Sequence, residues 1–238
     1  LGHENRIVLY ENYEGHGMLM EPVNRGSAWR KGFDTPVNYD DNGNYCGGMH
    51  VQIKNGGKCG LCGDDYASPR PRKNENTGKY GVGQIVRTYT SGQLIDVVAR
   101  IHANHGGYFR FAVCPLNHSK ELESEECFNK YPVKLEDGSY KFMLGGRRGD
   151  VEMKAYLPAG LRCKHCVFRW EYVAGNNWGR CPDGSQKQGC GPQETYRTFI
   201  NQEKKPSTFP AREINNSVPF IFFCAVVSAA TPNNQKHR

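Results

Sequence analysis

Short stretches in which apolar and polar residues alternate recur through the middle of the chain, and turn residues separate them. In YFRFAVC, residues 108–114, this alternation places Phe109, Phe111 and Val113 on one face of an expected strand. Similar stretches are GQIVRTY, LIDVVARI, MKAYLPAGLRC and CVFRWEYV. Several short alternating strands with regular turns between them predict an all-β fold, specifically a β-sandwich.

In CVFRWEYV, residues 166–173, the alternation separates the side chains onto two faces. Phe168, Trp170 and Tyr172 share one face of the expected strand. Arg169 and Glu171 share the other. The 28 glycines and 13 prolines of this 238-residue chain agree with a fold rich in turns.

The distribution of charged residues argues against a nucleic-acid partner, and the length of the longest apolar run argues against a membrane partner. The net charge is +7, but lysines and arginines are interspersed with acids, as in KNENTGK and SKELESEE, so no basic stripe for nucleic acid is present. The apolar run VPFIFFCAVVSAA, residues 218–230, is too short to span a bilayer. We therefore expect neither a nucleic-acid nor a membrane partner.

Ten cysteines are the strongest feature of the composition. In a chain of this size they indicate an oxidising compartment and several disulfides. Two CxxC pairs, Cys59/Cys62 and Cys163/Cys166, could instead hold zinc, but about a hundred residues separate them, so disulfides are favoured. The sequons at Asn117 and Asn215 agree with secretion. The RGD tripeptide at 148–150 carries little weight, because three-residue matches are common by chance.

Candidate catalytic chemistry is confined to histidine. His102 and His105, in IHANHGGYF, lie between two expected strands and could bind a metal or be ordinary polar loop residues. No Ser-His-Asp order, phosphate-binding loop, dinucleotide fingerprint or carboxylate pair can be identified. An enzymatic function would therefore depend on a metal.

Several blocks of the sequence together resemble one family. HGMLMEPVNRGSAWRKGFDTPVNYDDNGNYCGG, KCGLCGDDY, GKYGVGQIVRTYTSGQLIDV, ANHGGYFRF, LPAGLRCKHCVFRWEYVAGNNWG and GCGPQETYR occur in this order. They resemble the lytic polysaccharide monooxygenases of auxiliary activity family fifteen, the arthropod type. The resemblance runs from His16 to about Thr198.

The resemblance implies a copper enzyme on an immunoglobulin- or fibronectin-III-like sandwich with long, disulfide-stapled loops. Its copper ligands would be His16, through an α-amine and the ring, and His105. Ala103 would pack near the axial face of the metal, while Gln193 and Glu194 would orient the oxygen species. Imidazole suits copper, and an α-amine with a pKa of roughly 7.7–8.0 can lose its proton to the metal near neutral pH.

The resemblance also implies the reaction and its partners. Copper reduced by an external electron donor would react with hydrogen peroxide or dioxygen, and hydroxylation beside a glycosidic bond would break the polysaccharide. The substrate would be insoluble chitin or cellulose, bound on a flat face for which Trp29 and Tyr39 are candidates. We expect a secreted, extracellular, monomeric enzyme.

Both flanks differ from the family pattern. Residues 1–15 precede His16 without the features of a signal peptide, and residues 199–238 follow the family pattern poorly. The sequence thus predicts an N-terminal extension over 1–15, the sandwich over 16–198, and a poorly structured segment without the family's last strand over 199–238. With His16 not at the N-terminus and that strand missing, we expect weak copper binding and little activity. The alternatives are an inactive chitin- or cellulose-binding module and, less favoured, a structural zinc protein.

Overall fold

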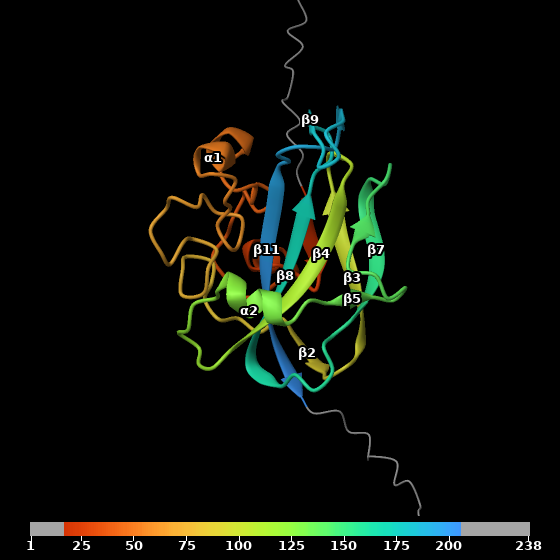
Figure 1. The fold of residues 1–238 in the computed structure, drawn as a ribbon. Helices are drawn as coiled ribbons and strands as arrows, with labels where there is room; N and C mark the ends of the chain where they lie inside the picture. Colours follow the sequence, from red (N-terminus) through yellow and green to blue (C-terminus); the bar gives the residue numbers. More distant parts are fainter. Residues whose placement is uncertain (1–16, 206–238) are drawn as a thin grey trace, which may run out of the picture. The chain divides into compact units, whose positions relative to one another are not determined.

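Two sheets enclose an apolar core in the computed structural model, which describes residues 17–205 (Figure 1). One sheet has the strand order β1-β3-β7-β5 and the other β2-β11-β8-β4-β6. The strands are β1 Gly17–Glu21, β2 Arg87–Thr90, β3 Leu94–Ile101, β4 Tyr108–Leu116, β5 Lys134–Leu135, β6 Phe142–Met143, β7 Gly149–Tyr156, β8 Cys163–Val173 and β11 Thr195–Lys205. The predicted all-β sandwich is therefore confirmed.

Short helices and one hairpin complete the described part of the fold. The hairpin is formed by β9 Trp178–Arg180 and β10 Gln186–Gln188, which stand at one end of the sandwich (Figure 1). The helices are η1 Arg25–Lys31, α1 Met49–Lys54 and α2 Glu125–Lys130. No helix in residues 17–205 is long and apolar enough to cross a membrane.

The alternating pattern of the sequence corresponds to the core-facing positions of the central strands. Phe109 in β4 lies opposite Tyr172 in β8, which lies opposite Tyr196 in β11, and all three side chains are buried. Their rings contact one another in series, with centroids 5.1 Å and 5.4 Å apart. Period-two alternation predicted this face correctly because it is buried against the other sheet along its whole length.

The opposite face of β8 is charged and buried. Arg169 and Glu171 are only 5% and 2% exposed, and Glu171 accepts hydrogen bonds from Arg110 and Arg197. Burial opposes ionisation of Glu171, but the nearby Arg197 and Arg110 outweigh it and lower the pKa of this carboxyl to about 2. Helix α2 supplies a further carboxylate, Glu125, to Arg169 and Arg197.

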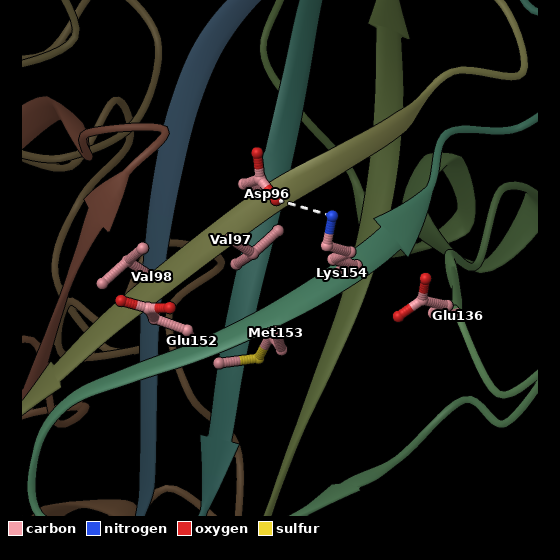
Figure 2. A pocket seen from close by; sticks show the side chains of 7 residues that line it. All are labelled: Asp96, Val97, Val98, Glu136, Glu152, Met153 and Lys154. Atoms are coloured by element: carbon pink, nitrogen blue, oxygen red, sulfur yellow. Dashed lines mark ion pairs between the residues drawn. The ribbon is translucent and has the colours of Figure 1, made fainter.

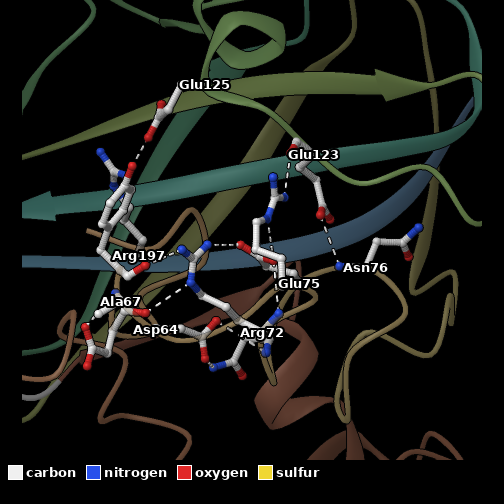
Figure 3. Close-up of polar contacts among 12 residues, drawn as sticks. Asp64, Ala67, Arg72, Glu75, Asn76, Glu123, Glu125 and Arg197 are labelled. Carbon is white, nitrogen blue, oxygen red and sulfur yellow. Dashed lines mark hydrogen bonds and ion pairs between the residues drawn. The ribbon is translucent and has the colours of Figure 1, made fainter. Parts of the chain in front are cut away.

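The long segment between η1 and β2 is held by buried polar groups (Figure 3). Arg72 pairs with the buried Glu75 at 2.6 Å, and the backbone N–H of Asn76 donates to Glu123 at 3.0 Å. Glu123 also pairs with Arg25 of η1 at 2.7 Å. Because each of these charges has a partner, the segment can be buried against the sandwich without a large apolar core of its own.

Within residues 17–205, four disulfides staple the loops, as predicted: Cys46–Cys59, Cys114–Cys127, Cys163–Cys166 and Cys181–Cys190. The two CxxC pairs differ, because Cys163 bonds to Cys166 whereas Cys59 bonds to Cys46. Cys62 is a free thiol, buried beside Phe199, and burial raises its pKa well above the usual value. Cys224 lies outside the described residues.

The expected end of ordered structure at Thr198 is corrected by β11. This strand continues to Lys205, antiparallel to β8 and parallel to β2. Phe199 and Ile200 are fully buried on its two faces. A last strand is therefore present, and it extends beyond Thr198.

The continued strand carries one mismatched core residue, Gln202. Its side chain is fully buried, and within residues 17–205 neither amide atom has a hydrogen-bond partner. We expect Gln202→Met to raise the free energy of unfolding by about 1–3 kcal/mol, because an unpaired buried amide is destabilising. Urea unfolding measures the change, with Gln186→Met in exposed β10 as the control. A lower free energy of unfolding for Gln202→Met would contradict the assignment of Gln202 as a destabilising core residue.

Candidate functional site

The loop between β3 and β4 presents His105 in a fixed backbone position. The backbone N–H of His105 donates to the phenol oxygen of Tyr172 at 3.0 Å, and its carbonyl accepts from the N–H of Gly175 at 2.8 Å. Both partners belong to β8 or to the residues that follow it. Burial raises the pKa of Tyr172 to about 12, so its hydroxyl remains protonated.

Asn104 fastens the same loop to the turn between β6 and β7. Its side-chain Nδ2 donates to the carbonyl of Gly145 at 2.8 Å and to that of Arg147 at 2.6 Å. Its Oδ1 accepts from the N–H of Gly106, on the other side of His105. The loop is thus held from two neighbouring segments, and His105 lies between them.

Close backbone packing requires a glycine after the histidine. Gly107 has a φ of +75°, and a Cβ there would lie 2.0 Å from the carbonyl oxygen of Val173. Only glycine allows this approach between the loop and β8. The ANHGG block therefore encodes the loop geometry as well as the histidine.

The His105 ring lies near the carboxylate of Glu194, the residue before β11, and a phenol of β11 holds that carboxylate. Glu194 Oε2 lies 3.9 Å from His105 Nδ1 and accepts a hydrogen bond from the Tyr196 hydroxyl at 2.7 Å. The His105 and Glu194 side chains are 19% and 15% exposed. His105 Nδ1 is buried, and no described group forms a hydrogen bond with it. The sequence pattern identified Glu194 but not Tyr196, whose place two residues later on the strand puts it on the same side.

Gln193 has a different environment from Glu194. Its Oε1 accepts from the N–H of Asn177 at 3.0 Å, and its Nε2 donates to the carbonyls of Asn177 and Cys190 at 3.1 Å and 2.8 Å. With both amide atoms bonded to backbone groups, Gln193 fixes the β9–β10 hairpin beside the site.

This hairpin presents Trp178, a residue absent from the candidates chosen from the sequence. Trp178 is 70% exposed, pairs with Gln188 across the hairpin, and is followed by the Cys181–Cys190 disulfide. A single exposed aromatic residue is common on protein surfaces, but the flat ring of Trp178 on a disulfide-braced hairpin is available for stacking on a ligand. Alternation of apolar and polar residues did not predict the exposure of Trp178, because the three residues of β9 are too few to show a periodicity.

The two aromatic residues expected on the substrate face differ in exposure. Tyr39 is 83% exposed. Trp29 is partly buried, donates from Nε1 to the carbonyl of Asn38 at 3.1 Å, and contacts the Tyr39 ring edge-on with centroids 5.5 Å apart. Trp29 therefore supports Tyr39 from beneath.

The remaining candidates occupy less informative positions. His102 and Ala103 are in the bend that follows β3, where His102 is exposed and Ala103 partly exposed. His16 lies outside the described residues. Gly17, which follows it in the chain, begins β1 and pairs with Ile101 at the end of β3, next to the His105 loop.

The chemistry of His105 fits copper. Imidazole is a good copper ligand. His105 Nδ1 is buried and has no hydrogen-bond partner among the described groups, so it is available to bind a metal. In residues 17–205 no three His, Cys, Asp or Glu side chains form a group that could hold a metal. Such side chains within that range would therefore not hold a metal at His105 as a cluster of three.

A hollow of about 460 Å³ lies elsewhere, over β3 and β7 (Figure 2). It contains the Asp96–Lys154 ion pair, at 3.4 Å, and the carboxylates of Glu136 and Glu152. Exposed charged residues of this kind are usual on the solvent face of an antiparallel sheet. The hollow contains no histidine or exposed aromatic ring, and we assign it no function.

The RGD tripeptide is not free for adhesion. Asp150 accepts two hydrogen bonds from Arg100, at 2.6 Å and 2.8 Å, and these lower the pKa of its carboxyl. An adhesion receptor would have to displace Arg100 first.

A sandwich with a fixed, copper-compatible histidine at one end indicates a metalloenzyme, and comparisons with known proteins define the class as the copper-dependent monooxygenases of polysaccharides. A family model described as lytic polysaccharide mono-oxygenase, cellulose-degrading, matches residues 16–201. A solved structure, the lytic polysaccharide monooxygenase AA15 from Thermobia domestica in the Cu(I) state, is 44% identical with a TM-score of 0.78. The match covers 79% of this chain and 98% of that chain. No curated protein matches.

The chain belongs to the lytic polysaccharide monooxygenases, in auxiliary activity family fifteen. Its function is the copper-dependent oxidative cleavage of glycosidic bonds in polysaccharides.

Proposed function

We propose that His16 and His105 hold a single copper ion in a sandwich domain spanning residues 16–205. The observation that carries this proposal is the His105 ring, which has a fixed backbone and a buried Nδ1 without a described partner. Gly17 supports it, because β1 begins beside the end of β3, directly after His16 in the chain.

Bound copper supplies the one-electron chemistry that activates hydrogen peroxide or dioxygen after reduction by an external donor. The residues around it position the ligand. Glu194 Oε2 lies 3.9 Å from His105 Nδ1, too far for a direct hydrogen bond, so Nδ1 remains without a described partner and is available to the metal.

Tyr196 and Tyr172 complete this arrangement. The Tyr196 hydroxyl donates to Glu194 and holds the carboxylate in place, while its ring stacks on Tyr172 with centroids 5.4 Å apart. Tyr172 in turn holds the backbone of His105. We propose Glu194 and Tyr196 as the groups nearest the copper, with Gln193 positioning the hairpin and Ala103 lining the loop.

We propose that the protein acts outside the cell, as a monomer, on insoluble chitin or cellulose. Tyr39 and Trp178 are exposed aromatic residues that can stack on pyranose rings. Trp178 follows the Asn177 backbone that Gln193 fixes, and Gly175 bonds to His105, so the aromatic ring is linked through short contacts to the metal ligand. Trp29 contributes by supporting Tyr39.

A second candidate function follows from the residues before His16. While Gly15 remains attached, the nitrogen of His16 is an amide and not an amine. In that form the protein would bind polysaccharide through its aromatic face without oxidising it. Removal of residues 1–15 distinguishes the two functions, as argued in the Discussion.

Trp178→Ala tests the substrate surface. We expect its affinity for chitin or cellulose particles to fall roughly 10-fold, about 1.4 kcal/mol, with copper binding unchanged. Sedimentation binding isotherms measure the affinity on both substrates. The control is Tyr156→Ala, which removes a 44%-exposed aromatic residue from β7. Equal losses of affinity in the two variants would show that Trp178 contributes only nonspecific apolar contact with the particles.

A further inference from the structure

One sequon of the chain lies on the described surface, at Asn117-His118-Ser119. These three residues are exposed and directly follow Leu116, the last residue of β4. A sequon in a strand interior would be sterically closed to an oligosaccharide, whereas this one lies in a bend where the chain leaves the sheet.

The local structure fixes the backbone of the sequon and leaves room at its side chain. Glu121 accepts hydrogen bonds from the backbone N–H and from Nδ2 of Asn117. The Cys114–Cys127 disulfide anchors the chain just before the bend. A glycosylated amide retains one N–H, so the contact with Glu121 is compatible with an attached sugar.

We infer that Asn117 is an N-glycosylation site, located at the end of the sandwich away from His105. The inference rests on the extracellular location proposed above. In the transfer, Nδ2 of Asn117 forms a bond to C1 of N-acetylglucosamine and loses one proton. The bond from C1 to the oxygen of a lipid pyrophosphate breaks, and the lipid pyrophosphate leaves.

The direction of β4 places the glycan far from the catalytic end. His105 lies three residues before β4 begins, and Asn117 follows its last residue. Nine strand residues at roughly 3.4 Å each separate the two ends by about 30 Å. A glycan at Asn117 therefore leaves His105, Trp178 and the polysaccharide free, while it covers the end opposite the substrate.

The experiment uses the full chain behind a cleavable secretory leader in insect cells, analysed in both the culture medium and the membrane fraction. Asn215→Gln is introduced first, so that Asn117 is the remaining sequon. Treatment with peptide N-glycosidase should then remove one oligosaccharide and convert the Asn117 amide to a carboxylate, located by peptide mass spectrometry. Adding Ser119→Ala or Asn117→Gln should abolish the modification.

Two outcomes would overturn the inference. One is an unmodified Asn117 in the Asn215→Gln protein from both fractions. The other is an oligosaccharide that persists in the Ser119→Ala protein. Absence from the medium with a glycan present in the membrane fraction would count against the proposed extracellular location and still support the site. Binding to chitin particles should be unchanged by Asn117→Gln, because the glycan lies at the other end of the sandwich.

Discussion

Removal of residues 1–15, so that the chain begins at His16, is expected to convert a weak copper binder into a tight one. Losing a group that only orients a metal ligand lowers metal affinity roughly 10–100-fold, and gaining a ligand should exceed that range. The new ligand is the α-amine, whose pKa of roughly 7.7–8.0 allows deprotonation by the metal near neutral pH. The peptide nitrogen of His16 in the longer chain offers no comparable lone pair.

Isothermal titration with Cu(II) measures this gain, and electron paramagnetic resonance reports the number of nitrogen ligands. The matched control is the same chain with its α-amine acetylated, which has the same residues and carries an amide at His16. We expect tight binding and oxidised oligosaccharides from the chain with the free amine, and neither from the acetylated chain. Equal affinity in the two chains would contradict the assignment of His16, and would leave the sandwich as a binding module.

The fold was largely predictable because its central strands alternate between apolar and polar residues. The stretch LIDVVARI coincides with β3, residues 94–101, and the expected strand YFRFAVC lies within β4. The prediction for GQIVRTY was less accurate, since β2 begins only at Arg87. The residues before it join a loop held by buried polar contacts, which periodicity does not describe.

The sequence was also misleading at the last strand, where the family pattern was expected to end at Thr198. The family model matches as far as residue 201, and β11 continues to Lys205 because a strand needs backbone partners and mainly apolar inward positions. Ile200 meets that requirement and Gln202 does not. Pairing with β8 and β2 thus continues the sheet past Thr198, where the sequence pattern predicted it to end.

At the candidate site, sequence blocks predicted the ligands, and the structure shows which residues support the His105 loop. His105 and Glu194 belong to recognisable blocks, whereas Tyr172, Asn104 and Trp178 act through contacts between distant segments. A hydrogen bond between residues 105 and 172 leaves no signal in local spacing. The same holds for the pairing of Cys59 with Cys46 instead of with its CxxC neighbour.

Replacement of His105 by alanine, in the chain that begins at His16, is expected to abolish oxidative cleavage and to remove tight copper binding. The backbone bonds from His105 to Tyr172 and Gly175 do not involve the imidazole, so the loop and the fold should survive. The loss can therefore be attributed to the missing ligand nitrogen. His102→Ala is the matched control, because it removes an exposed imidazole from the bend just before the same loop.

Thermal unfolding with and without Cu(II) separates a binding defect from a folding defect. A ligand at about 1,000 times its dissociation constant stabilises the folded state by about 4 kcal/mol, so copper should raise the Tm of the parent chain and of His102→Ala. In His105→Ala the Tm should be close to the parent's copper-free value and should not respond to copper. If instead His102→Ala lost the copper-dependent shift and His105→Ala retained it, the metal would be bound at the exposed histidine, and the buried Nδ1 facing Glu194 would have only a structural role.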